Sequence, residues 1–197
     1  MEETEARARL QDESHQLRAQ NDWLRSELDR LRNELQQRTG SHADAEVPFP
    51  SNLAEVGEWA HQAVPGRLII LPRAIRAAKQ SVYGKPEQVF RALLTLANEY
   101  RDMRVEGGSA KKAAFDKTLE ELGLRCEPTF SGVGYGEFGD TYIVDWQGER
   151  KLLDTHLKNG GNTRDPTRCL RIYFFWDADV QQAVIGSFPG HLESRLS

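Results

Sequence analysis

The chain has 197 residues, of which 39% are hydrophobic and 28% are charged, and its formal net charge is −4. This composition is typical of a water-soluble protein with one or two domains and a modest core. No apolar run approaches the roughly 20 residues that a membrane helix needs, and the acidic, polar N-terminus lacks the hydrophobic region of a secretory signal. We therefore expect a cytoplasmic protein with no membrane association.

The two cysteines, Cys126 and Cys169, are too few for a disulfide framework and suit a reducing compartment. Together with His156 and His191 they are four candidate metal ligands. Their spacing matches neither C-x-x-C nor H-x-x-x-H, the patterns typical of zinc sites. We expect no metal and no other cofactor.

Residues 1–38 carry a seven-residue leucine repeat. If the repeated leucines occupy heptad position d, Asn21 falls at position a, where asparagine favours a parallel two-stranded register. Glu27 and Arg32 then have the g-to-e′ spacing of ion pairs between parallel helices. A single solvated helix with chance leucines is the alternative. We expect a parallel homodimer with a seam formed by Leu10, Leu17, Asn21, Leu24, Leu28, Leu31 and Leu35.

The rest of the chain reads as one globular domain. Residues 39–50 are rich in Gly, Ser, Asp and Pro without periodicity, which is typical of a linker. Residues 51–123 have mostly helical periodicity, and residues 124–197 alternate with a period of two. We therefore expect an α+β domain at 51–197, in which a helical segment packs on a small antiparallel sheet.

Helix start signals divide the first part of this domain. Ser51 and Ser109 are suitable N-caps, and Pro72 and Pro86 suit the first turn of a helix. A short buried strand is expected at 67–71. In the second part we expect strands at 125–130, 141–146, 153–158, 170–176 and 182–186.

The expected sheet carries a local excess of positive charge. Between positions 150 and 172 there are six Lys or Arg residues and two Asp. Residues two apart on a strand share a face, so His156 and Lys158 point the same way, as do Arg171 and Tyr173. If the strands pair, one surface gathers an imidazole, an ammonium, a guanidinium and a phenol, and His191 follows the last strand at its rim.

This set of side chains suits an RNA backbone. Lysine and arginine stabilise the charge that develops on a phosphate, and a histidine accepts the proton of the ribose 2′-OH at neutral pH. The attacking group is then the RNA's own hydroxyl, so no metal is needed. The catalytic candidates are His156, Lys158, Arg171, Tyr173 and His191. Candidate RNA contacts are Arg164, Arg168 and Arg195.

Each candidate also has a structural explanation that the sequence leaves open. His156 would simply satisfy a backbone carbonyl, and Lys158 and Arg171 would be solvated or form salt bridges. Tyr173 would belong to the core of an aromatic run, and His191 would cap the following turn.

The order of helices followed by three antiparallel strands, with the pattern K-x-x-x-x-HLK … LRIYFFWD … VIG … HL, resembles the RelE/HigB-type toxins, which are bacterial endoribonucleases that cut mRNA. The resemblance covers about residues 86–195. His156 and Lys158 match the alternate basic residues of one strand, and Arg171 matches the arginine two positions before a tyrosine. His191 or Arg195 matches the tail. The resemblance implies an RNA substrate, on the ribosome in many members, and an antitoxin or defence-complex partner.

Three features depart from that family: the long 159–169 connection, the large helical segment and the leucine-repeat helix. Two further classes of function therefore stay open. One is a non-catalytic RNA- or protein-binding module of a bacterial or phage complex, dimerised by the N-terminal helix. The other is a structural adaptor in which that helix is the working part.

Overall fold

The computed structural model describes Leu31 and residues 47–130, 140–160 and 165–192. The chain divides into two units, Met1–Ala45 and Glu46–Ser197. In the first unit the description is limited to Leu31, which lies in a helix and is exposed. The rest of the expected coiled-coil seam lies outside the described residues.

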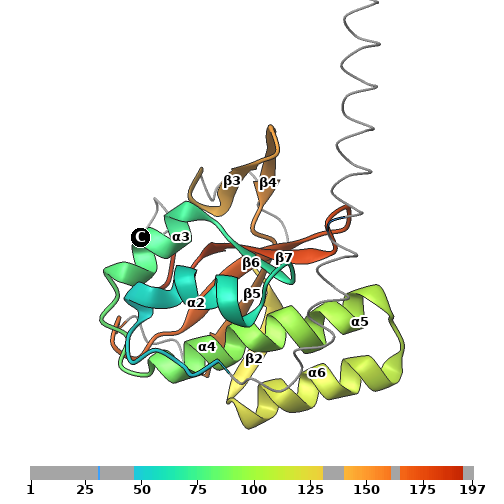
Figure 1. Cartoon of the computed structure of the whole chain (residues 1–197), viewed down its shortest axis with the longest axis horizontal. Helices are drawn as coiled ribbons and strands as arrows, with labels where there is room; N and C mark the ends of the chain where they lie inside the picture. The colour runs from blue at the N-terminus through green and yellow to red at the C-terminus, as the bar shows by residue number, and fades with distance from the viewer. Residues whose placement is uncertain (1–30, 32–46, 131–139, 161–164, 193–197) are drawn as a thin grey trace, which may run out of the picture. The chain divides into compact units, whose positions relative to one another are not determined.

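The second unit opens with a helical segment in which the prolines begin two helices, as the sequence predicts (Figure 1). Two caps differ from the prediction. Asn52 rather than Ser51 caps the first turn, since its Oδ1 accepts a 2.9 Å hydrogen bond from the Ala54 amide, and Gly108 rather than Ser109 is the last N-cap. The helical elements are η1 (Leu53–Glu55), α2 (Val56–Ala63), α3 (Pro72–Lys79), α4 (Pro86–Thr95), the π-helical η2 (Leu96–Tyr100), α5 (Arg101–Val105) and α6 (Ser109–Glu121).

The main sheet has five strands in the order β1-β7-β6-β5-β2. The three strands expected at its centre are antiparallel neighbours, and β2 also pairs antiparallel with β5. The sheet as a whole is mixed, because β1 pairs parallel with β7. The strands are β1 (Leu68–Ile70), β2 (Leu124–Pro128), β5 (Thr155–Asn159), β6 (Arg171–Asp177) and β7 (Gln182–Ser187); β3 (Ile143–Trp146) and β4 (Glu149–Leu152) form a separate two-stranded sheet.

The expectation of one purely antiparallel sheet was therefore wrong in two respects: β1 pairs parallel with β7, and the strand expected at 141–146 lies in the separate β3–β4 sheet. A parallel neighbour requires a long crossover connection. Here β1 and β7 are joined by the rest of the domain, so their pairing joins residues more than a hundred positions apart. A three-residue apolar run carries no local signal for a partner that distant.

Alternation along the strands gives the main sheet two buried faces. Leu157, Ile172 and Phe174 point to the helices and belong to the larger core with Phe90 and Leu93 of α4. The opposite face carries a second core, formed with the β3–β4 hairpin by Tyr142, Val144, Leu153, Tyr173, Phe175 and Val184.

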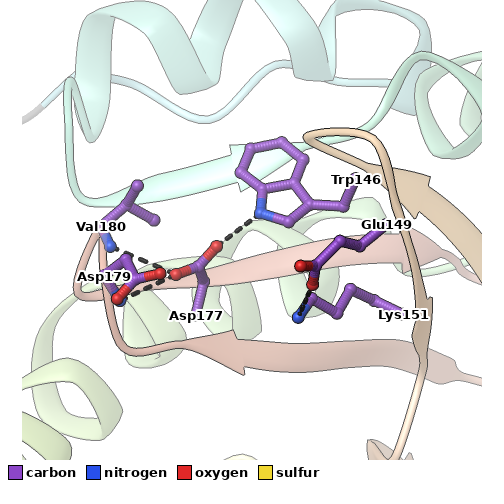
Figure 2. Close-up of polar contacts among 6 residues, drawn as sticks. All are labelled: Trp146, Glu149, Lys151, Asp177, Asp179 and Val180. Carbon is purple, nitrogen blue, oxygen red and sulfur yellow. Dashed lines mark hydrogen bonds and ion pairs between the residues drawn. The ribbon is translucent and has the colours of Figure 1, made fainter. Parts of the chain in front are cut away.

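The hairpin is tied to the main sheet by polar contacts as well. The Trp146 indole N–H donates to the Asp177 carboxylate, whose other oxygen accepts from the amides of Asp179 and Val180 at 2.9 and 3.2 Å (Figure 2). On β4, Lys151 pairs with Glu149 at 2.6 Å. The Asp177 carboxylate therefore connects the turn after β6 to the β3–β4 hairpin.

Arg73 of α3 makes a second connection. Its guanidinium donates to the carbonyl oxygens of Gly186 (2.6 Å), Ile143 (3.0 Å) and Thr141 (3.2 Å). One side chain thus joins a helix, the main sheet and the start of the hairpin. At Gly186 a side chain would overlap Leu153, so the glycine permits the close packing of β7 against the second core.

Candidate active site

The strand register brings four of the predicted catalytic residues to one place. His156 lies opposite Tyr173, and Lys158 lies opposite Arg171, across β5 and β6. The Asn159 amide donates to Leu170 O at 3.3 Å, so the main-chain groups of His156 and Lys158 point the other way, to β2. Both pairs are therefore of the non-hydrogen-bonded type, in which opposite Cα atoms lie only about 4.5 Å apart.

His156 is a buried imidazole, 9% exposed, whose ring stacks on Tyr173 with centroids 5.4 Å apart. Its Nδ1 is buried and has no hydrogen-bond partner among the described residues. The pKa of His156 is lowered to about 4, first by burial and then by the charges of Arg171, Lys158 and His191, while Glu127 acts in the opposite direction. The imidazole is consequently neutral at pH 7.

Lys158 and Arg171 are two basic residues that lie directly opposite each other on β5 and β6. Arg171 is 6% exposed, and its Nη1 donates to the carbonyl oxygens of Leu170 (3.0 Å) and Asn159 (3.3 Å). The Lys158 side chain is 24% exposed and pairs with Glu127 of β2. That ion pair lowers the pKa of Glu127.

Tyr173 is 3% exposed and belongs to the second core, where its ring meets Tyr142 at 5.5 Å. Burial raises the pKa of the phenol. Tyr173 therefore lies in the core, as the structural alternative for this residue proposed, and from there its ring stacks on His156.

The segment after β7 runs beside the start of β6, because the Arg171 amide donates to Pro189 O at 2.6 Å. This places the exposed His191 close enough for its charge to lower the pKa of His156. Arg168 is exposed in the connection before β6. Arg164 and Arg195 lie outside the described residues.

Two residues on the same face were missing from the predicted site. Glu127 lies opposite His156, and Arg125 lies opposite Lys158, on the neighbouring strand β2. Alternation in the sequence groups Arg125 with Glu127, but nothing local indicates that β2 pairs with β5. The cluster is thus a row of acidic and basic groups rather than a purely positive one.

An open hollow of about 620 Å³ lies at the edge of this row, between β2 and α6. Its lining is mixed, with apolar Leu119 and Leu124 beside charged groups. Within the described parts of the chain no group of three His, Cys, Asp or Glu side chains is placed to hold a metal ion. The same parts contain no helix long and apolar enough to cross a membrane.

The site therefore consists of a neutral buried imidazole, two basic residues opposite each other on neighbouring strands, a phenol stacked on the imidazole and an exposed second imidazole. Such a set offers basic groups to an anion and, in neutral His156, a proton acceptor. No protein-family model matches the chain, and searches for similar proteins and for similar solved structures found none.

Proposed function

We propose that this protein is a RelE/HigB-like, metal-independent endoribonuclease that cleaves RNA through attack of the 2′-OH. The observation that carries the proposal is the pairing of Lys158 directly opposite Arg171, next to His156 with its unpartnered Nδ1.

Like charges directly opposite each other on neighbouring strands destabilise a sheet. A buried polar nitrogen without a partner also costs free energy. Glu127 offsets part of the cost at Lys158, but neither feature stabilises the fold by itself. Departures of this kind concentrate at functional sites. A phosphate between the two cations would compensate their charge, which favours an RNA backbone as the ligand.

The residues then have distinct roles. Neutral His156 accepts the 2′-OH proton while the 2′ oxygen attacks phosphorus. Lys158 and Arg171 stabilise the negative charge on the phosphate oxygens in the transition state. His191 protonates the departing 5′ oxygen, so the products are a 2′,3′-cyclic phosphate and a 5′-hydroxyl. Tyr173 is a positioning residue, and the Glu127–Lys158 ion pair opens when the phosphate binds.

The test incubates the full chain with an RNA oligonucleotide in excess EDTA and identifies the new ends. We expect cyclic-phosphate ends, and we expect Lys158→Ala to lower the cleavage rate by about 100-fold or more. Lys151→Ala is the matched control, because Lys151 is an ion-paired strand lysine outside the site. Equal cleavage by wild type and Lys158→Ala would refute the assignment.

The second candidate is a non-catalytic RNA- or protein-binding module dimerised by the N-terminal helix. The burial of Arg171 and the engagement of Lys158 by Glu127 favour it, because both cations already have partners within the domain. Expression in bacteria separates the two. Growth arrest by wild type that Lys158→Ala and Arg171→Ala abolish supports the enzyme, and the resemblance then also implies an antitoxin that covers this face. Harmless expression of all three supports the binding module.

A further inference from the structure

Strand β2 is the edge of the main sheet on the side of the candidate site. The Thr129 amide donates to Asp154 O at 2.7 Å, so by alternation Glu127 and Arg125 direct their main-chain groups to β5. Leu124, Cys126 and Pro128 direct theirs outward. In the described sheet no further strand lies on this side.

We propose that this edge pairs antiparallel with β2 of a second copy of the chain, about a twofold axis at Cys126. The proposal goes beyond the nuclease function and does not depend on it. In this register Arg125 lies opposite Glu127 of the second copy, and the reverse pair is identical by symmetry. The strand is thus charge-complementary to itself, which is what an isologous contact requires.

The main chain fits the same register. The two Cys126 residues exchange a pair of hydrogen bonds, and each Leu124 N–H donates to Pro128 O of the other copy. Pro128 has no N–H, so the ladder ends there, as expected for proline on an edge strand. Glu127 can serve both partners, because Lys158 contacts its Oε2 and a carboxylate accepts hydrogen bonds at both oxygens.

The hollow of about 620 Å³ beside β2 leaves room for the second strand. Its α6 side is lined by Asp116, Leu119 and Glu120, and Asp116 pairs with Lys112 at 2.6 Å. Asp116 and Cys126 line the same hollow.

The opposite charges of Arg125 and Glu127 on either side of Cys126 favour a second copy over a foreign strand, because a foreign partner does not require such a symmetric arrangement. The heptad repeat supports the same choice. A parallel coiled-coil dimer holds two copies near each other with twofold symmetry and raises their effective concentration.

Cys126 provides a direct test. In a hydrogen-bonded antiparallel pair the Cα atoms lie about 5.5 Å apart, within the range that a disulfide bridges. Diamide is the oxidant: the two thiols form an S–S bond, and diamide takes up both electrons and both protons. We expect diamide to convert the full chain with Cys169→Ser to a covalent dimer through Cys126.

The matched control carries Cys126→Ser, Cys169→Ser and Thr129→Cys. In the proposed register the two residues at position 129 lie about 20 Å apart, so no covalent dimer forms. Absence of the Cys126 dimer, or equal yields at both positions, would overturn the pairing.

Charge exchange tests the register independently. Arg125→Glu or Glu127→Arg alone opposes like charges, and we expect each to lower the Cys126 cross-linking yield several-fold. The double variant restores opposite charges and recovers the yield; it also keeps an acid opposite Lys158. Cross-linking yields that stay the same in the single and double charge variants would overturn the proposal. RNA cleavage is not the readout here, so failure of this pairing leaves the proposed function standing.

Discussion

His156 combines burial with three neighbouring basic residues, and both conditions oppose its protonation. The same surroundings keep the imidazole neutral, which is the form that a base requires. They also make its protonation unfavourable. Because His156 resists protonation in the folded state, the stability of the fold at acid pH depends on this residue of the candidate site.

The pKa of His156 is about 4 in the folded protein, against 6.5 for a solvated histidine, so between these two values the unfolded chain binds more protons. The free energy of unfolding therefore falls as the pH drops from 6.5 to 4, by up to about 3 kcal/mol. We expect urea unfolding of wild type at about pH 7.5, 6 and 5 to reveal this slope and His156→Gln to flatten it.

His61→Gln is the matched control, because His61 is exposed on α2. It should retain the wild-type slope. Equal slopes in wild type and His156→Gln would mean that His156 does not titrate as its surroundings require.

Single residues also show how much of the candidate site could be predicted from the sequence. Alternation correctly put His156 with Lys158, and Arg171 with Tyr173, because the period of a strand is a local property. Glu127 was missed, since it joins the site through pairing with a strand about thirty positions away. The burial of Tyr173 follows from the hairpin that covers it, which is again a distant segment.

Among the elements, the β3–β4 hairpin is held by a few long-range contacts rather than by a long ladder. Arg73 supplies three hydrogen bonds from one side chain, and burial lowers its pKa. The Arg73 guanidinium thus satisfies carbonyl groups of both sheets and of the segment before β3.

We expect Arg73→Ala to lower the free energy of unfolding by about 2–3 kcal/mol, because buried carbonyl groups lose a charged donor. Arg76→Ala, on an exposed position of the same helix, should change it by less than about 0.5 kcal/mol. Chemical denaturation of both variants measures the difference. Similar effects of the two substitutions would mean that Arg73 does not join the sheets.

For the molecule as a whole, the leucine repeat predicts a parallel dimer, and the described Leu31 is exposed on a helix. We expect light scattering of the full chain to give twice the 22.4 kDa mass of one chain. Leu24→Glu with Leu31→Glu should give the monomer mass at micromolar protein, because charges at position d remove the seam and the β2 edge is too short to hold a dimer alone.

Val82→Glu is the control for this experiment. It also replaces an exposed apolar residue by glutamate, but it lies outside the repeat, so the dimer should persist. A monomeric wild type, or a dimer unaffected by the two leucine substitutions, would contradict the coiled coil.

The sequence by itself determined the local features: the α+β composition, the helices that begin at Pro72 and Pro86, and the faces on which His156, Lys158, Arg171 and Tyr173 lie. Caps, proline geometry and periodicity act within a few residues, so they can be read directly. The tertiary structure decided the rest: the parallel β1–β7 pair, the hairpin over the second face and the presence of Glu127 beside Lys158. Strand pairing depends on contacts between distant segments, and no local pattern specifies which segments meet.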